Sequence, residues 1–323
     1  MIKSSYKVKV ILFALLIISI SCSKNHNNNA SLHYTVIDSI RVNFDSSVKI
    51  YSLNRTLDQQ FVCIDFYDRF SIYLFDEAGD VLSVYSEKGQ GPGEIRRAQI
   101  LDTQDNYILV IDSDNSKIII LKAEDNRILF DTEFKIKQHA MDIAMIDEDR
   151  LLISHLGEKN VYLYDRKGNI INSFSVDSKS NISSMNEYLS TALSVKKFPD
   201  SNRISFANMV TGNLFIANFE EDDFTEIIEI KPNSKLAKGL EVVSDKENEH
   251  TTINMNGIKS HQCLPGITIA SIKNAQYEDI FDIYDSKGLF LHHAIIDNWN
   301  NSLNGSFFFL DASFAQKVQK GGE

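Results

Sequence analysis

A short strand pattern followed by a turn recurs along the chain. Each copy is a run of β-branched and aromatic residues that ends in an aspartate, with a glycine three residues later and a second apolar run behind it. The clear copies carry these pairs of aspartate and glycine: Asp76 and Gly79, Asp165 and Gly168, Asp285 and Gly288. β-Branched and aromatic residues favour a pleated, half-buried surface, while Asp and Gly supply a turn with a positive φ angle. Each copy therefore predicts a β-hairpin whose aspartate is a turn residue rather than a catalytic group.

Weaker copies fill the gaps between the clear ones. They cover residues 118–122 and 214–218, and matching positions of successive copies then lie roughly 40 to 70 residues apart. A four-stranded propeller blade takes about 40 to 50 residues, and the longer intervals leave room for insertions at 178–188 and 236–259. A short helix is expected in the first insertion, over residues 184–191. The repeat predicts an all-β protein, a β-propeller with four-stranded antiparallel blades.

The number of blades follows from the length of the chain. About 290 residues remain once the N-terminal segment is set aside, which gives about 48 residues per blade for six blades and about 41 for seven. Five copies of the repeat are visible, so the sixth blade must combine both ends of the chain. We expect residues 34–44 to pair with the apolar run 307–310, because a closed ring leaves no exposed sheet edge. The prediction is a six-bladed propeller, a single domain over residues 34–323.

The first thirty residues are of a different kind. Three lysines precede an uncharged stretch over residues 10–20. This stretch is too short for a transmembrane helix, which needs about 20 apolar residues, and it matches the apolar core of an export signal. Ser19, Ile20 and Ser21 stand directly before Cys22. Small residues before a cysteine resemble the lipobox of bacterial lipoproteins, which usually has Leu where this chain has Ser19.

This pattern predicts a lipoprotein signal peptide over residues 1–21 and a lipid on Cys22. The alternative is cleavage by the general signal peptidase, which would leave Cys22 unmodified. Residues 22–33 are polar and indicate a tether between the anchor and the folded domain. They hold no acidic run, and an acidic run after the cysteine resembles the surface-export signal of Bacteroidetes lipoproteins. The expected location is the outer membrane of the cell envelope, with the periplasmic side favoured over the cell surface.

Composition narrows the classes of partner. The chain is 43% hydrophobic and 24% charged, which is typical of a globular protein, and its net charge is −11. Nucleic acids and anionic membranes need concentrated Lys and Arg, so we expect no nucleic-acid partner and membrane contact through the lipid alone. Cys63 and Cys263 could pair or be buried thiols, and the apolar run around Cys63 favours a thiol there. No Cys or His spacing typical of a metal site occurs.

A glycine-rich segment joins the first two copies of the repeat. It contains Gly89, Gly91, Pro92 and Gly93 and is followed by Glu94. Phosphate-binding loops have a helix N-terminus behind such glycines and usually a Lys followed by Ser or Thr, and this segment has neither. The glycines instead indicate a tight structural connection between blades, with backbone angles that other residues resist. Its polar end, Glu94 with Arg96 and Arg97, is the candidate ligand-binding site, at one end of the propeller channel.

This loop and the hairpin before it resemble a known family. A Gly-x-Gly-Pro-Gly-Glu loop after the first such hairpin is similar to that of the six-bladed, TolB-like β-propeller lipoproteins of Bacteroidetes. The resemblance covers roughly residues 34–299. It implies a six-bladed fold and a lipid-anchored location in the envelope, and it implies no established activity.

Two classes of function fit these features. The first is a non-enzymatic binding or scaffold lipoprotein that holds a protein, peptide or glycan on one propeller face, since no nucleophile elbow, zinc motif or carboxylate pair stands out. The second is a hydrolase or lyase with its site in the central channel, where carboxylates could hold Ca²⁺. The candidates for that site are Asp112, Asp114, Asn115 and Asp142. The first three also have the composition of a turn, and the spacing is not that of an EF-hand. No catalytic or metal-binding residue is therefore assigned, and no cofactor is indicated beyond this Ca²⁺ alternative.

Overall fold

The computed structural model describes residues 48–230, apart from 49, 57, 66, 178–184 and 200, and beyond this range residue 287 and the strands named below. Side chains are described within 48–230, except at residues 51, 185 and 186, and at Cys263, Ile283, Tyr284 and Lys287. The predicted lipid-bearing Cys22 and the tether up to residue 30 lie outside the described residues.

Four consecutive four-stranded antiparallel sheets make up residues 50–230. The first contains β4 (Ile50–Arg55), β5 (Phe61–Asp65), β6 (Ile72–Phe75) and β7 (Val81–Tyr85). The second contains β8 (Ala98–Gln104), β9 (Tyr107–Asp112), β10 (Lys117–Glu124) and β11 (Arg127–Lys135). The third contains β12 (Ala140–Met145), β13 (Arg150–His155), β14 (Val161–Asp165) and β15 (Ile170–Phe174). The fourth contains β16 (Leu193–Lys197), β17 (Arg203–Asn208), β18 (Leu214–Glu220) and β19 (Asp223–Ile230).

The remaining strands form three further sheets. One repeats the same antiparallel order with β22 (Ile258–Leu264), β23 (Ile267–Lys273), β24 (Asp279–Asp285) and β25 (Phe290–Ile296), and adds β2 (Ser31–Tyr34) parallel to β25. A two-stranded sheet of β20 (Gly239–Asp245) and β21 (His250–Asn256) fills the predicted second insertion. The last joins β26 (Phe308–Phe309), β1 (Val8–Leu12) and β3 (Ile40–Val42).

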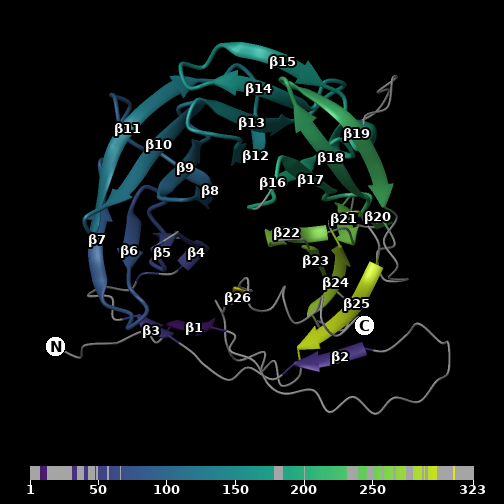
Figure 1. Cartoon of the computed structure of the whole chain (residues 1–323), viewed down its shortest axis with the longest axis horizontal. Helices are drawn as coiled ribbons and strands as arrows, with labels where there is room; N and C mark the ends of the chain where they lie inside the picture. The colour runs from purple at the N-terminus through teal and green to yellow at the C-terminus, as the bar shows by residue number, and fades with distance from the viewer. Residues whose placement is uncertain are drawn as a thin grey trace.

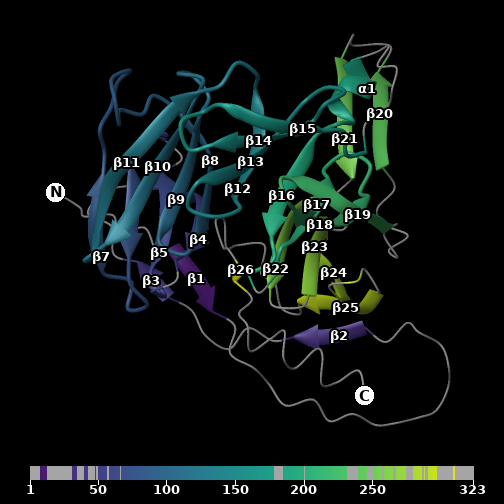
Figure 2. The same ribbon diagram turned by 45° about the horizontal axis from the view of Figure 1, so that its top comes forward.

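The four-stranded sheets follow one another around a common centre. Figure 1 shows β4, β8, β12, β16 and β22 nearest this centre and β7, β11, β15 and β19 on the outside. Figure 2 shows the first two of these sheets standing side by side. The chain therefore completes one sheet from the inside outward before it starts the next, as blades of a propeller do. This confirms the predicted all-β class and the four-stranded antiparallel blades.

The core lies between neighbouring blades. The middle strands β10 and β13 are buried along almost their whole length, because each has a blade packed on either face. Apolar residues of the first two blades, among them Ile64 and Ile108, form one such cluster, and Ile111 and Ile153 belong to the next. This double burial explains why the repeat reads as nearly continuous apolar runs rather than strict alternation.

The turns of two clear repeat copies, in the first and third blades, have one geometry. Asp76 Oδ1 accepts the N–H groups of Ala78 and Asp80, each at 2.9 Å. Asp165 Oδ1 accepts those of Lys167 and Asn169, each at 2.8 Å. Both glycines have positive φ, +86° at Gly79 and +85° at Gly168. These contacts give both aspartates the turn role that the repeat predicts.

The weaker copies lack this motif because they turn differently. In the second blade Asp125 and Asn126 both have positive φ, and so do Glu221 and Asp222 in the fourth. Two central residues with positive φ are typical of the tight turns that connect hairpins without a glycine at the third position. The same hairpin is thus built from two different turn sequences. This explains why the sequence repeat is clear in some blades and weak in others.

Several smaller predictions can also be compared with the structure. The short helix α1 (Met185–Leu189) forms within the predicted range 184–191. Cys63 is buried and Cys263 is half-buried, and neither forms a disulfide bond. Strands from both chain ends, β3 and β26, share one sheet, but each pairs with β1, which lies inside the predicted signal peptide, rather than with the other. No helix in the described part of the chain is long and apolar enough to cross a membrane.

Candidate functional site

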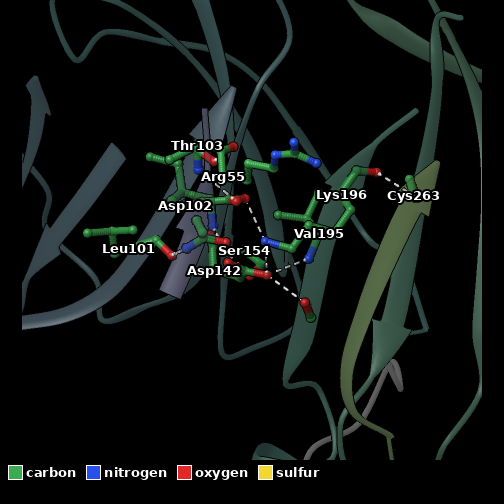
Figure 3. A network of polar contacts seen from close by, with 12 residues as sticks. Arg55, Leu101, Asp102, Thr103, Asp142, Ser154, Val195, Lys196 and Cys263 are labelled. Carbon is green, nitrogen blue, oxygen red and sulfur yellow. Dashed lines mark hydrogen bonds and ion pairs between the residues drawn. The ribbon is translucent and has the colours of Figure 1, made fainter. Parts of the chain in front are cut away.

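Three charged side chains meet where the innermost strands come together. Asp102 lies on β8, Asp142 on β12 and Lys196 on β16, and we call them the central cluster (Figure 3). Lys196 Nζ lies 2.5 Å from Asp102 Oδ2 and 3.5 Å from Asp142 Oδ2. The lysine of the fourth blade thus reaches past the third blade to a carboxylate of the second.

Asp142 is the better satisfied of the two carboxylates. Its Oδ2 accepts the Ser194 hydroxyl at 2.5 Å and the Val195 N–H at 3.0 Å, and its Oδ1 accepts the Ile143 N–H at 2.9 Å. The side chain is 8% exposed. Donors from its own strand and from the next blade stabilise its charge, apart from any help from Lys196.

Asp102 depends on the lysine. Besides Lys196, its side chain accepts the Thr103 N–H at 2.8 Å. Burial raises the pKa of Asp102 above its ordinary value and Asp142 raises it further, while Lys196 opposes both. Burial by itself would lower the pKa of Lys196, but the charges of Asp102 and Asp142 outweigh burial and raise this pKa. Two carboxylates thus share one ammonium group, and the cluster carries one excess negative charge.

Other polar groups tie the inner strands to one another around this cluster (Figure 3). These contacts run from Asn54 Nδ2 to the Leu101 carbonyl at 2.6 Å, from Thr103 Oγ1 to the Arg55 carbonyl at 2.8 Å, from Ser154 Oγ to the Leu193 carbonyl at 2.7 Å, and from Cys263 Sγ to the Lys196 carbonyl at 3.9 Å. They connect β4 to β8, β13 to β16 and β16 to β22. The polar groups at the centre therefore cross-link the blades.

A second kind of polar site recurs where the second, third and fourth blades are each joined to the blade before. The second strand of three blades ends in a fully buried polar side chain, and we call these residues the connection anchors: Asp112, His155 and Asn208. Asp112 accepts the N–H groups of Arg96 at 2.9 Å and Arg97 at 3.0 Å, just before β8 begins. In this way a side chain of the blade holds the backbone of the segment that leads into it.

The other two anchors use different chemistry at the same place. His155 Nδ1 lies 3.2 Å from the carbonyl of His139, which directly precedes β12. Asn208 Nδ2 donates to the Ser190 carbonyl at 2.7 Å, shortly before β16. Burial lowers the pKa of His155 to about 4, so this imidazole is neutral at pH 7.

The glycine-rich connection is held by contacts within the protein. Glu94 Oε2 accepts the Gly91 N–H at 2.7 Å, and Glu133 Oε2 accepts the Gly93 N–H at 3.0 Å. Gly93 has a φ of +75°, and a Cβ there would stand 2.9 Å from the Tyr85 hydroxyl oxygen. The buried Lys117 donates to the Gly91 carbonyl at 2.9 Å. This segment needs glycine for both its backbone angle and its close packing.

The predicted ligand-binding residues lie at this connection but face different surroundings. Glu94 turns back onto its own loop, as its bond to Gly91 requires. Arg96 and Arg97 are exposed, and Arg97 makes a loose ion pair with Asp114 at 3.9 Å. Pro92 is exposed on the same loop.

Of the residues considered for a channel site, Asp112 and Asn115 belong to the connection, where Asn115 donates to Asp112 at 2.7 Å. Asp142 alone among those candidates is in the central cluster. Asp102 and Lys196 were missed. Each is a charged residue inside a strand run, and nothing in the local sequence pairs them. Within the part of the chain that the structure describes, no group of three or more His, Cys, Asp or Glu residues could hold a metal ion.

The strand order and the arrangement of the sheets define the chain as a protein of the β-propeller class. No protein-family model matches the chain, and no curated protein matches it. Among solved structures, a protein of unknown function from Bacteroides caccae is 11% identical over 82% of this chain and 88% of its own, with a TM-score of 0.52. A functionally unknown protein from Desulfotomaculum acetoxidans is 12% identical over 80% of this chain and 78% of its own, with a TM-score of 0.50.

A third solved structure is the β-propeller domain of Cps50 (Swd1) from Myceliophteria thermophila. It is 10% identical over 80% of this chain and 76% of its own, with a TM-score of 0.48. At the identities of the two bacterial proteins the likeness concerns the fold alone.

Proposed function

We propose that the chain is an envelope lipoprotein whose propeller is a non-enzymatic binding or scaffold module. The observation that carries this proposal is the central cluster, whose charged groups bind one another and the neighbouring strands. Catalysis needs a group that is held ready for substrate, whereas these groups are used to join blades. The exposed Arg96 and Arg97, held by Asp112 on a rigid connection, supply a surface on which a protein, peptide or glycan partner could dock.

Photo-crosslinking tests the binding role. A photoreactive amino acid placed at Arg96 in the envelope of a producing bacterium should give a discrete adduct, while the same group at the exposed Lys167, in the turn after β14, should give none. Adducts of equal yield from both positions would contradict a specific docking surface at the connection. Because both positions are exposed, neither replacement should disturb the fold.

The anchor is the second part of the proposal. The uncharged stretch over residues 10–20 and the small residues before Cys22 support a lipid on that cysteine. The Cys22→Ala variant should move from the membrane to the soluble envelope fraction, and labelled palmitate should no longer enter the protein. A variant that stays with the membrane would argue against the lipid. The outer membrane, with its periplasmic side, is the proposed location.

A six-bladed, TolB-like ring is the third part. Five four-stranded units in one repeating order support it, together with the sheet that contains strands from both chain ends. An experimental structure of the chain that begins at residue 22 should contain a sixth sheet built from the two ends. A ring closed by five blades would exclude it.

An enzymatic alternative has one observation in its favour. Asp102 and Asp142 lie in one cluster and differ in their hydrogen-bond partners, and two carboxylates in different environments can divide the roles of acid and base. A hydrolase or lyase would lose turnover in both Asp102→Asn and Asp142→Asn while it keeps its fold. A panel of ester and glycoside substrates, assayed with and without Ca²⁺, would show such turnover, and a loss confined to these variants would favour the enzyme over the binding module.

A further inference from the structure

The charges of the central cluster cannot all be paired. Lys196 is one ammonium group between two carboxylates that belong to different blades. The side chains of Asp102, Asp142 and Lys196 are 14%, 8% and 23% exposed, so water screens the excess negative charge poorly. A cluster of this kind gains by taking up a cation, and the smallest one available is a proton.

The two carboxylates would not share such a proton equally. Protonation of Asp142 would weaken three hydrogen bonds, to Ser194, Val195 and Ile143. Protonation of Asp102 would affect one backbone N–H, that of Thr103, and the contact with Lys196. The proton therefore goes to Asp102, and Lys196 has a second carboxylate only 3.5 Å away.

We propose that the central cluster is a proton-linked latch between blades, in which a proton from solvent binds the Asp102 carboxylate and Lys196 transfers its ion pair to Asp142. At neutral pH the lysine of the fourth blade is shared, and it lies closer to the carboxylate of the second blade, at 2.5 Å, than to that of the third, at 3.5 Å. After protonation it joins the fourth blade to the third, and the cluster is neutral. The two states differ by one proton and by a movement of the ammonium group across the gap between two carboxylates.

The other polar groups around Asp102 bind other partners and do not pair with its carboxylate. From β4, Arg55 offers its backbone carbonyl, while its guanidinium group binds Gln59 and Glu77. From β16, Lys197 donates to the carbonyl of Ile146. Among the described side chains of β22, Cys263 contacts the Lys196 carbonyl. Within the described residues, Lys196 and Asp142 are thus the charged groups that act on Asp102, as the causes of its pKa shift also indicate.

The raised pKa of Asp102 determines whether the folded state gains or loses stability as pH falls. A carboxyl group whose folded pKa lies above its unfolded value of 3.8 holds its proton more tightly in the folded state. This contribution to stability is complete below that unfolded value and is lost as pH rises through the folded pKa. Mild acid should therefore favour the folded chain relative to a variant that cannot take up the proton.

Urea unfolding of the full chain in detergent, from pH 7.5 to pH 4.5, tests the proton uptake. The folding equilibrium constant of the wild type, divided by that of Asp102→Asn, should rise as pH falls, by at most about tenfold per pH unit for one proton. Asp142→Asn removes the excess charge, so in that background the ratio of the folding constants with Asp102 and with Asn at position 102 should no longer rise as pH falls. Asp112→Asn changes another buried carboxylate, and in that background the same ratio should still rise as pH falls.

A double-mutant cycle tests the transfer of the lysine. The coupling between Asp102→Asn and Lys196→Gln should fall on going from pH 7.5 to pH 4.5, while the coupling between Asp142→Asn and Lys196→Gln should increase. A stability ratio that does not change with pH would overturn the proposal. So would two couplings that fall together, because the lysine would then leave the cluster instead of changing partner.

Discussion

The connection anchors and the central cluster solve the same problem, which is how to bury polar groups in an all-β ring, in different ways. Asp112 meets backbone N–H groups of the segment next to it, so its donors are fixed by the path of the chain. Asp102 instead depends on a side-chain ammonium group from a strand two blades away. The first arrangement recurs in three blades and tolerates different residue types, whereas the second occurs once among the described residues and depends on every member.

The largest effect is expected from the central cluster. Lys196→Met leaves two buried carboxylates without their cation and should lower the free energy of unfolding by about 3–5 kcal/mol. Urea denaturation measures this loss. Adding Asp102→Asn to Lys196→Met should recover part of it, because one of the two like charges is removed. Lys167→Met, at an exposed lysine, should cost less than about 0.5 kcal/mol. Equal losses at both lysines would mean that the central cluster contributes no more to stability than an exposed lysine does.

Asp112→Asn tests whether an anchor depends on its particular chemistry. The carboxylate accepts N–H groups on both oxygens, and an amide would turn one NH₂ group toward a donor. The loss should be about 2–3 kcal/mol in urea denaturation. Asn208 stands at the matching position but must donate to a carbonyl, so Asn208→Asp should also destabilise. If either exchange left the free energy of unfolding unchanged, the anchors would be interchangeable. They would then not depend on the chemistry of each side chain.

The histidine anchor should make the fold sensitive to acid. Its folded pKa of about 4 lies below the unfolded value of 6.5, so its contribution is complete above pH 6.5 and is lost as pH falls toward 4. The wild type should lose about 2 kcal/mol relative to His155→Gln between pH 7.5 and pH 5. Urea denaturation of both proteins at each pH measures the difference. The sign is opposite to that of Asp102, and a gain in acid would contradict the buried, neutral imidazole.

The smallest effect is expected at the surface of the connection. Arg97 is 58% exposed and its ion pair with Asp114 is loose, so Arg97→Ala should change stability by less than about 0.5 kcal/mol. Thermal unfolding at low and high salt checks this, with Asp114→Ala as the matched variant. A larger loss would mean that the side chain, and not only its backbone N–H, belongs to the anchor.

The sequence predicts the features whose causes are local. The turns at Asp76 and Asp165 follow from an aspartate and a glycine three residues apart, and their geometry is as expected. The blade order follows from the repeat. The anchors are invisible to a search for repeats because Asp112, His155 and Asn208 are different residue types at one structural position.

The central cluster could not be predicted for a different reason. Asp102 and Lys196 are brought together only when three blades have formed, and 94 residues separate them along the chain. The sequence around either residue does not identify the other as its partner. Glu94 shows the converse case, since its place beside three glycines suggested a ligand contact and the structure gives it a backbone partner. A long-range polar contact depends on the closed ring, which residue types alone do not encode.

The reach of Lys196 past the third blade also bears on how the molecule unfolds. In a protein made of stacked units, each unit touches its immediate neighbours, and such chains can lose their units one at a time. A contact between the second and fourth blades ties three units together, so that none of them can open without breaking it. We expect these blades to melt as one cooperative block, and Lys196→Met to split a single transition into separate steps that hydrogen exchange would resolve blade by blade.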